Sequence, residues 1–369
     1  MTLSLYQDLA KLFSEIGFGI RYCPELDALL RALFTEEEAK LALNLSPLAP
    51  EPPKSVAERT GGDPDAVARM LDEMTDKGLI YCSQRGDEKR YKIIQVVPGI
   101  FELQFMKGEF TSRTEELAKL FDAYFHAREV EAPGNVAVTP FARVIPVDRS
   151  VATNVSVLPY ETARQYIEQS ETISLTTCYC RHKQRLLDKG CDHPDDVCLT
   201  FGAFADFVIK RGFGRKIGSE EALDAMERAR ASGLVTTTSN TRDRIDFICN
   251  CCDCCCGVLQ SVKKSNWPSM AAGSNYWVEV DPETCVACGE CADICPMEAI
   301  AVEEDAAMVD LQRCIGCGVC VTVCPSEALA LTPRPERQEP FQDFRALVQQ
   351  QFKEKVAAAE ESEPKHTGS

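Results

Sequence analysis

The chain has 369 residues, of which 45% are apolar and 26% are charged, and its formal net charge is −17. The length allows about two or three domains, and the composition is ordinary for a globular protein. Because nucleic-acid affinity comes from cations that neutralise phosphates, the negative charge disfavours nucleic-acid binding and suits a protein that meets basic partners.

Apolar residues and cysteines together suggest a cellular location. The apolar runs stay well below the roughly 18 residues of a membrane-spanning helix. The first residues carry neither the features of a signal peptide nor a twin-arginine signal. Twenty cysteines in such a chain indicate metal binding rather than disulfides. We therefore expect a cytoplasmic protein without a membrane span, in a reducing compartment and best suited to an anaerobic cell.

The first part of the chain predicts helices. Leucine and alanine recur at helical spacing over residues 25–44, and a proline-rich segment at 46–53 ends this pattern. A short helix is expected over 55–61. A longer helix over 63–77 begins with an aspartate cap and is followed by a glycine, which are the usual start and stop signals.

Two short strands, 79–82 and 90–94, follow these helices and flank a polar turn. This order of helices and hairpin, together with the Val-Ala-Glu-Arg-Thr-Gly sequence at 56–61, resembles the winged helix-turn-helix family. The resemblance implies a winged-helix-like module over residues 1–98.

A DNA-binding module of this family would place the 63–77 helix in the major groove. That helix carries five acidic residues against Arg69 and Lys77, so the phosphates would repel it. The mildly basic hairpin keeps DNA binding as an alternative. We favour a module for protein docking or dimerisation.

Residues 99–175 are expected to form a helical and extended connector. A helix is predicted over 114–129, an extended proline-rich stretch over 132–146, and a second helix over 159–169. Motifs in this region indicate no function.

Ten cysteines define a predicted cysteine-rich domain over 176–265. One group lies within 178–198 and a second within 249–256, with a helix expected between them over 219–232. Adjacent cysteines point in different directions, so one metal centre cannot use all of the second group. Such thiols are prone to oxidation unless they are held. We predict a centre that draws on both groups, with the candidate ligands Cys178, Cys180, Cys191, Cys198, Cys249, Cys251, Cys252 and Cys255.

Eight further cysteines form two copies of one pattern, Cys-x2-Cys-x2-Cys-x3-Cys-Pro. The copies are Cys285, Cys288, Cys291 and Cys295, then Cys314, Cys317, Cys320 and Cys324. Residues 278–332 therefore resemble the bacterial two-cluster ferredoxin family. The resemblance implies a ferredoxin domain over 275–333, with a strand before each cysteine loop and a short helix after each Cys-Pro. Zinc is disfavoured, because zinc sites require neither the third cysteine nor the Cys-Pro.

The same family exchanges cysteines between its two copies. A [4Fe-4S] cube needs four thiolates, and one tight loop supplies three of them. One cluster is then expected on Cys285, Cys288, Cys291 and Cys324. The other is expected on Cys314, Cys317, Cys320 and Cys295. The apolar side chains expected to shield both clusters from water are Val286, Ile294, Ile315 and Val319.

Three interpretations of the middle cysteines stay open. The first is a third iron–sulfur cluster, which the neighbouring ferredoxin motif favours. The second is a zinc site of four thiolates, or of three with an imidazole from His182 or His193. The third is a thiol–disulfide relay. We interpret the two histidines as loop residues or as neighbours of the ligands.

The chain is thus predicted to be an α+β multi-domain protein that ends, over 334–369, in a helix at 340–358 and a disordered glutamate-rich tail. The expected function is electron transfer through two [4Fe-4S] clusters, with a possible third centre, to or from a partner oxidoreductase. We expect the protein to be an electron-transfer protein or a subunit of an oxidoreductase complex rather than an enzyme on its own. Alternatives are a redox-responsive regulator and a reductase with an open cluster site.

Overall fold

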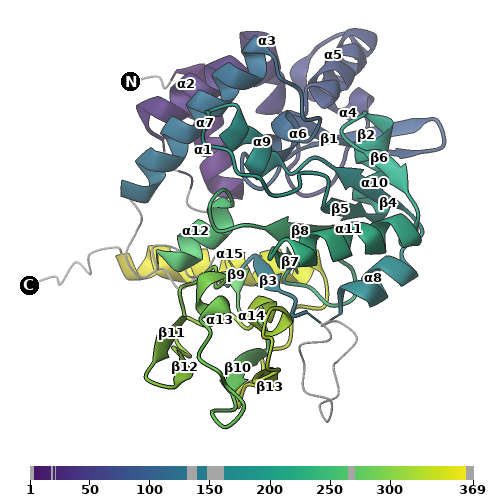
Figure 1. Cartoon of the computed structure of the whole chain (residues 1–369). Coiled ribbons are helices and arrows are strands. Elements are labelled where there is room, and N and C mark those ends of the chain that lie inside the picture. The colour runs from purple at the N-terminus through teal and green to yellow at the C-terminus, as the bar shows by residue number, and fades with distance from the viewer. Residues whose placement is uncertain are drawn as a thin grey trace, which may run out of the picture. The chain divides into compact units, whose positions relative to one another are not determined.

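The computed structural model describes residues 4–17, 20, 22–130, 139–147, 162–264 and 271–362. These residues mix helix and strand, as the sequence predicts (Figure 1). The chain divides into two compact units. Unit 1 comprises Met1–Ala132, Ser174–Asp195 and Ala203–Lys216, and unit 2 comprises Pro133–Ile173, Asp196–Gly202 and Ile217–Ser369. No helix among the described residues has the length and apolar character needed to cross a membrane.

Unit 1 opens with helices followed by a hairpin. They are α1 (Leu5–Ile16), α2 (Pro24–Leu33), α3 (Glu36–Ala42), α4 (Pro53–Thr60), α5 (Pro64–Asp76), β1 (Ile80–Arg85) and β2 (Glu88–Ile93). The aspartate cap before α5 is confirmed, because Asp63 accepts a hydrogen bond from the Ala66 amide at 2.9 Å. The helical pattern predicted over 25–44 is confirmed by α2 and α3, which are separate helices because Thr35 caps α3 by accepting from the Glu38 amide at 3.2 Å.

Unit 1 has one apolar core, and its remaining elements lie wholly or mostly within this unit. They are α6 (Ile100–Phe105), α7 (Ser112–Val130), β4 (Ile173–Thr176), α9 (Tyr179–Arg185), α10 (Gly202–Lys210) and β6 (Arg215–Ile217). Fully buried side chains such as Phe13, Leu29 and Phe105 belong to this core. The helix predicted over 114–129 is confirmed by α7. The helices and hairpin have the predicted order, and the winged-helix assignment stays a prediction.

Unit 2 contributes five adjacent strands to a sheet, in the order β5-β8-β7-β3-β9. These strands are β3 (Ala142–Val144), β5 (Cys198–Phe201), β7 (Val235–Ser239), β8 (Phe247–Cys251) and β9 (Ala271–Ala272). The helices of this unit include α8 (Ala163–Gln169), α11 (Ser219–Ala231) and α12 (Gly257–Lys263). The predictions of helices over 159–169 and 219–232 are confirmed where the residues are described. In the sheet Thr237 pairs with Cys249, and Val235 pairs with Cys251.

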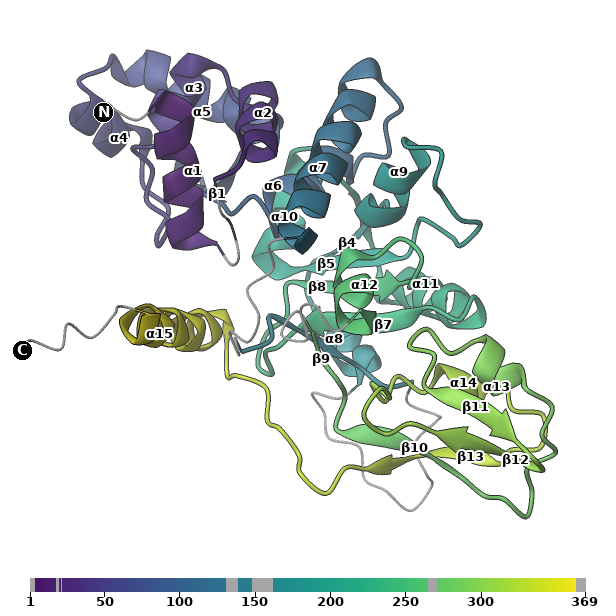
Figure 2. The same cartoon turned by 90° about the vertical axis from the view of Figure 1, so that its left-hand side faces the viewer.

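The duplicated cysteine motif folds into two antiparallel strand pairs (Figure 2). Its elements are β10 (Tyr276–Val280), α13 (Glu290–Asp293), β11 (Ile300–Glu303), β12 (Ala306–Val309), α14 (Val319–Thr322) and β13 (Leu329–Pro333). The predicted strand before each cysteine loop is confirmed by β10 and β12. The helix α15 (Phe344–Ser362) follows the motif and confirms the helix predicted for the tail.

The prediction of a short helix after each Cys-Pro is wrong. The helical turns α13 and α14 lie between the third and fourth cysteine of each copy. After each Cys-Pro the chain reverses at a residue with positive φ, Glu298 at 50° and Glu327 at 56°. A left-handed residue ends helical propagation, so a strand follows each Cys-Pro instead.

Candidate metal centres

The first cysteine loop borders a small cavity. Cys285, Cys288 and Cys291 line it from the first copy of the motif, and Cys324 lines it from the second copy. The loop turns through left-handed backbone at Ala287 and Gly289, which brings thiols at a spacing of three residues around one space. The cavity therefore gathers the four cysteines that the sequence assigns to one cluster. Their ligation of a metal cluster stays a prediction.

Backbone hydrogen bonds explain why the fourth thiol comes from the other copy. The Asp281 amide of the first copy donates to the Ala328 carbonyl of the second at 2.8 Å, and the Asp310 amide of the second donates to the Ala299 carbonyl of the first at 2.7 Å. The two bonds join equivalent positions in opposite directions. Each Cys-Pro segment is thereby fixed beside the other copy's cysteine loop.

The second set of thiols is more deeply buried. Burial raises the pKa of the Cys317 thiol to about 12, and the nearby Cys295 and Cys314 act in the same direction. Burial also raises the pKa of Cys320, with Cys317, Cys295 and Cys314 as neighbours. These charge effects indicate that the four cysteines of the second predicted set lie near one another. Metal binding would have to displace the protons from these thiols, which makes binding dependent on pH.

Shielding of the two cysteine loops is unequal. Ile315 and Val319, predicted to exclude water, are buried with 8% and 2% exposure. Val286, predicted to do the same at the first loop, lines the cavity and is 63% exposed, so its shielding of a cluster stays a prediction. Each of the two predicted thiol sets has a backbone amide close to one of its sulfur atoms. The Ala307 amide lies 3.5 Å from Cys285 Sγ, and the Ala299 amide lies 3.3 Å from Cys295 Sγ.

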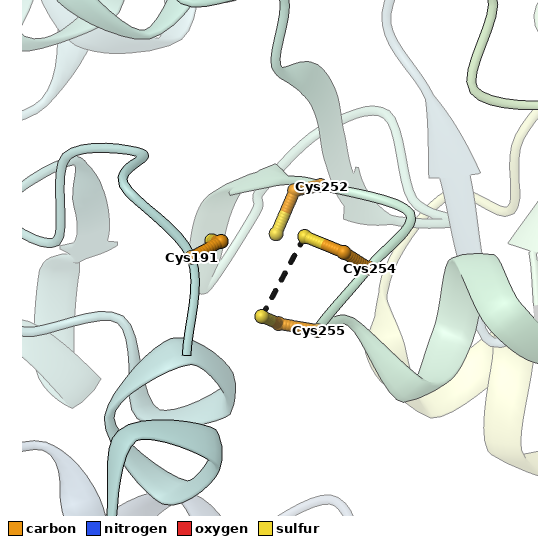
Figure 3. A group of neighbouring side chains, drawn as sticks. All are labelled: Cys191, Cys252, Cys254 and Cys255. Carbon is orange, nitrogen blue, oxygen red and sulfur yellow. Dashed lines mark hydrogen bonds between the residues drawn. The ribbon is translucent and has the colours of Figure 1, made fainter. Parts of the chain in front are cut away.

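A third group of thiols lies in the loop between β8 and α12. The sulfur atoms of Cys252, Cys254 and Cys255 lie within 4.8 Å of one another (Figure 3). Those of Cys254 and Cys255 are 3.6 Å apart. Residues of α12 fix this loop, because Gln260 Nε2 donates to the Cys254 carbonyl at 2.7 Å and Lys263 pairs with Asp253. We call these three cysteines the loop thiols.

The remaining cysteines of this segment have other neighbours. Cys251 Sγ lies 3.5 Å from Thr237 Oγ1 on β7. A hydrogen bond with Cys256, followed by burial, raises the pKa of Cys251 well above its ordinary value. Cys249 lies two residues earlier on the same strand and adds to this effect. The predicted ligand set omitted Cys254 and Cys256. The direction of each side chain in a run of cysteines depends on where the strand ends, and local sequence does not specify that end.

Unit 1 holds three other predicted ligands, Cys178, Cys180 and Cys191, whereas Cys198 lies in β5 of unit 2. Two contacts fix the segment around Cys191. Arg185 Nη2 donates to the Cys191 carbonyl at 3.1 Å, and the Cys178 amide donates to the Asp195 carbonyl at 2.8 Å. Cys191 is also drawn in Figure 3. Its backbone is positioned by unit 1 itself.

Buried cations accompany this segment of unit 1. Arg181 and Lys183 of α9 have 1% and 5% exposure. Their ion pairs, together with those of Arg185 and Lys189, converge on only two carboxylates, Asp122 and Asp195. Burial tends to raise the pKa of Asp122, but the hydrogen bonds and charges of Lys183 and Lys189 together outweigh it, and the net shift of this pKa is downward.

His182 is engaged in packing. Its Nε2 lies 2.9 Å from the Glu109 carbonyl, and its ring meets that of Phe110 edge to face. Burial lowers the pKa of His182, so the ring is neutral at physiological pH. These contacts agree with a histidine that supports the cysteine segment. The carbonyl of His193 accepts from Arg185 at 3.2 Å and helps to fix the same segment.

Comparison with protein families gives an independent indication. The model of the 4Fe-4S dicluster domain family matches residues 278–336. No curated protein matches the chain. Together with the loop thiols, the family match supports an iron–sulfur domain in this part of the protein.

Proposed function

We propose that the protein transfers single electrons through two [4Fe-4S] clusters to or from a partner oxidoreductase. The cavity at the first cysteine loop carries this proposal, because Cys324 lines it together with Cys285, Cys288 and Cys291. A [4Fe-4S] cube takes four thiolates, and the motif repeats with the same spacing. The second buried thiol set supports a second cluster.

Bound clusters of this type accept and release one electron each. The chain supplies the environment that sets how readily they do so. The amides of Ala299 and Ala307 point toward ligand sulfurs, and such donors favour the more negatively charged, reduced state. Buried Ile315 and Val319 keep water from the second site. A more exposed first site and a drier second site should therefore differ in reduction potential.

We further propose that the loop thiols hold a third iron–sulfur cluster. Cys191 is the proposed fourth ligand, because its segment is already fixed by Arg185 and lies beside the buried cations of α9. Lys263 links the cysteine loop to the dicluster domain, and such a link favours a redox-active iron cluster over redox-inactive zinc. Its ammonium pairs with Asp253 in the cysteine loop at 3.0 Å and with Glu298 beside the Cys295 segment at 2.8 Å. That bridge ties the loop to the dicluster domain, where electrons would be available.

Metal analysis of anaerobically purified protein tests the proposed function. We expect about eight irons and eight acid-labile sulfides per chain from the two repeats, and about twelve of each if the loop thiols also hold a cube. Dithionite reduction should give electron paramagnetic resonance (EPR) signals from interacting clusters. Stoichiometric zinc in place of iron would contradict the proposal.

A regulator that reads DNA through unit 1 is the second candidate, and one observation bears on it. Arg211 pairs with Asp72 and Asp76 of α5 at 2.8 and 2.6 Å, so that face of the helix is already covered. The exposed face of α5 carries Asp65 and Glu73, and DNA phosphates would repel these carboxylates. This arrangement favours a role for unit 1 in protein docking.

We therefore expect no sequence-specific DNA binding at physiological salt, in either oxidation state. Selection from a random duplex library, followed by fluorescence anisotropy on the enriched sequences, measures this directly. A recovered site whose affinity falls steeply with salt would reverse the order of the two functions.

A further inference from the structure

The two cysteine loops match in sequence spacing but differ in exposure. Every residue of the second loop from 315 to 320 is buried. In the first loop Val286, Cys288 and Glu290 are exposed. Val286 is 63% exposed, whereas its counterpart Ile315 is 8% exposed. Only the first site therefore presents its loop to solvent.

The second loop is buried because other parts of unit 2 pack on it. The Cys317 carbonyl accepts from the Val147 amide at 3.0 Å, and the Cys314 carbonyl accepts from Arg334 at 2.6 Å. Ser274 donates to the Gly316 carbonyl at 2.7 Å. These partners come from three separate segments of the chain. They turn the second site toward the interior of unit 2.

The surface around the first site has an apolar centre. Val286 and Val302 are exposed, and both line the cavity that contains Cys288. An apolar patch of this kind allows a partner to exclude water and approach closely. Close approach matters because electron transfer between separate centres weakens steeply with distance.

Acidic residues lie beside this apolar centre. Residues 279–312 contain ten aspartates and glutamates and no lysine or arginine. Glu303 ends β11 next to Val302, and with Glu304 and Asp305 of the following turn it forms an exposed acidic turn. Glu290 adds another exposed carboxylate in the first cysteine loop. A surface with this charge attracts a partner whose contact face is basic.

We propose that the first site is the port through which the protein exchanges electrons with a separate protein, and that the partner presents basic residues around its own redox centre. The inference rests on the proposed function, since it requires a cluster on Cys285, Cys288, Cys291 and Cys324. One electron passes between the partner's centre and this cluster, and no covalent bond changes. The second cluster then passes electrons within unit 2.

Cytochrome c serves as a basic one-electron probe of this surface. Wild-type protein is reduced with dithionite, freed of excess reductant, and mixed anaerobically with ferric cytochrome c in a stopped-flow instrument. The second-order rate constant should fall as ionic strength rises. The triple variant Glu303→Lys, Glu304→Lys, Asp305→Lys should react at least roughly tenfold more slowly at low salt. Its lysines repel the basic probe, which the wild-type carboxylates attract. The neutral Glu303→Gln, Glu304→Gln, Asp305→Asn variant should show an intermediate loss.

The matched control carries the same change in total charge in unit 1. Its substitutions, Glu58→Lys, Asp65→Lys and Glu73→Lys, are at exposed positions. The control should react within about twofold of wild type at equal ionic strength. Iron and sulfide content and EPR spectra are measured on every sample first. Absence of clusters from wild type would contradict the proposed function, whereas equal rates for the acidic-turn and control variants with intact clusters would overturn the port.

Discussion

Replacing Cys324 with alanine is expected to damage the cluster on the other copy's loop. The Cys324 side chain lines the same cavity as Cys285, Cys288 and Cys291, although it lies in the second copy of the motif. Removing this thiolate leaves the first cluster three protein ligands, and about four irons per chain should be lost or become labile. Mössbauer and EPR spectra distinguish the two clusters, and the signals of the Cys314 loop should persist.

The reciprocal variant provides the matched control. Cys295→Ala should damage the cluster on the second loop and spare the first, because Cys295 lies near Cys317 and Cys320. Loss confined to the second-loop cluster in the Cys324→Ala protein would show that each repeat closes its own cube. The crossed ligation would then be wrong.

Regular local signals made much of the fold predictable. Asp63 caps α5, and the alternating residues of the hairpin specify β1 and β2, so these elements follow from local sequence. Helix α1 was missed, although Ser4 and Gln7 form a capping box at its start. The serine and glutamine at this spacing were the available signal.

Tertiary contacts decided what local sequence could not. The two ferredoxin-like copies have the same cysteine spacing, so sequence predicts equal shielding for Val286 and Ile315. Their exposures differ because Val147, Ser274 and Arg334 donate hydrogen bonds to carbonyls of the second loop and cover it. Those residues lie far from the loop in the chain. Local sequence patterns do not predict these contacts.

The middle cysteines show the same limit at a smaller scale. Sequence identified the two groups and the need for a metal-binding explanation. It could not separate the loop thiols from Cys251 and Cys256, because β8 ends between Cys251 and Cys252 and the side-chain alternation of the strand ends there. The grouping of these thiols depends on the residue at which β8 ends.

Replacing Cys252 or Cys255 with alanine is expected to abolish the third centre and leave the ferredoxin-type pair intact. Both thiols are buried and belong to the loop thiols, so neither can be exchanged for a solvent ligand without opening the loop. Iron should fall from about twelve to about eight per chain. Because thiolate centres couple metal binding to local folding, amide exchange of α12 should also accelerate.

Single alanine variants identify the remaining ligand and test the grouping. Cys191→Ala should have the same effect as Cys252→Ala if Cys191 supplies the fourth thiolate, and Cys178→Ala, Cys180→Ala and Cys198→Ala test the other predicted ligands. Cys82→Ala and Cys256→Ala should keep full iron content, because Cys82 lies in the hairpin of unit 1 and Cys256 contacts Cys251. If wild-type protein holds only eight irons, and Cys252→Ala changes neither iron nor zinc, the third centre is wrong. The contact between Cys251 and Cys256 would then favour a thiol–disulfide relay, which thiol titration of oxidised and reduced protein would detect as two reversibly lost thiols.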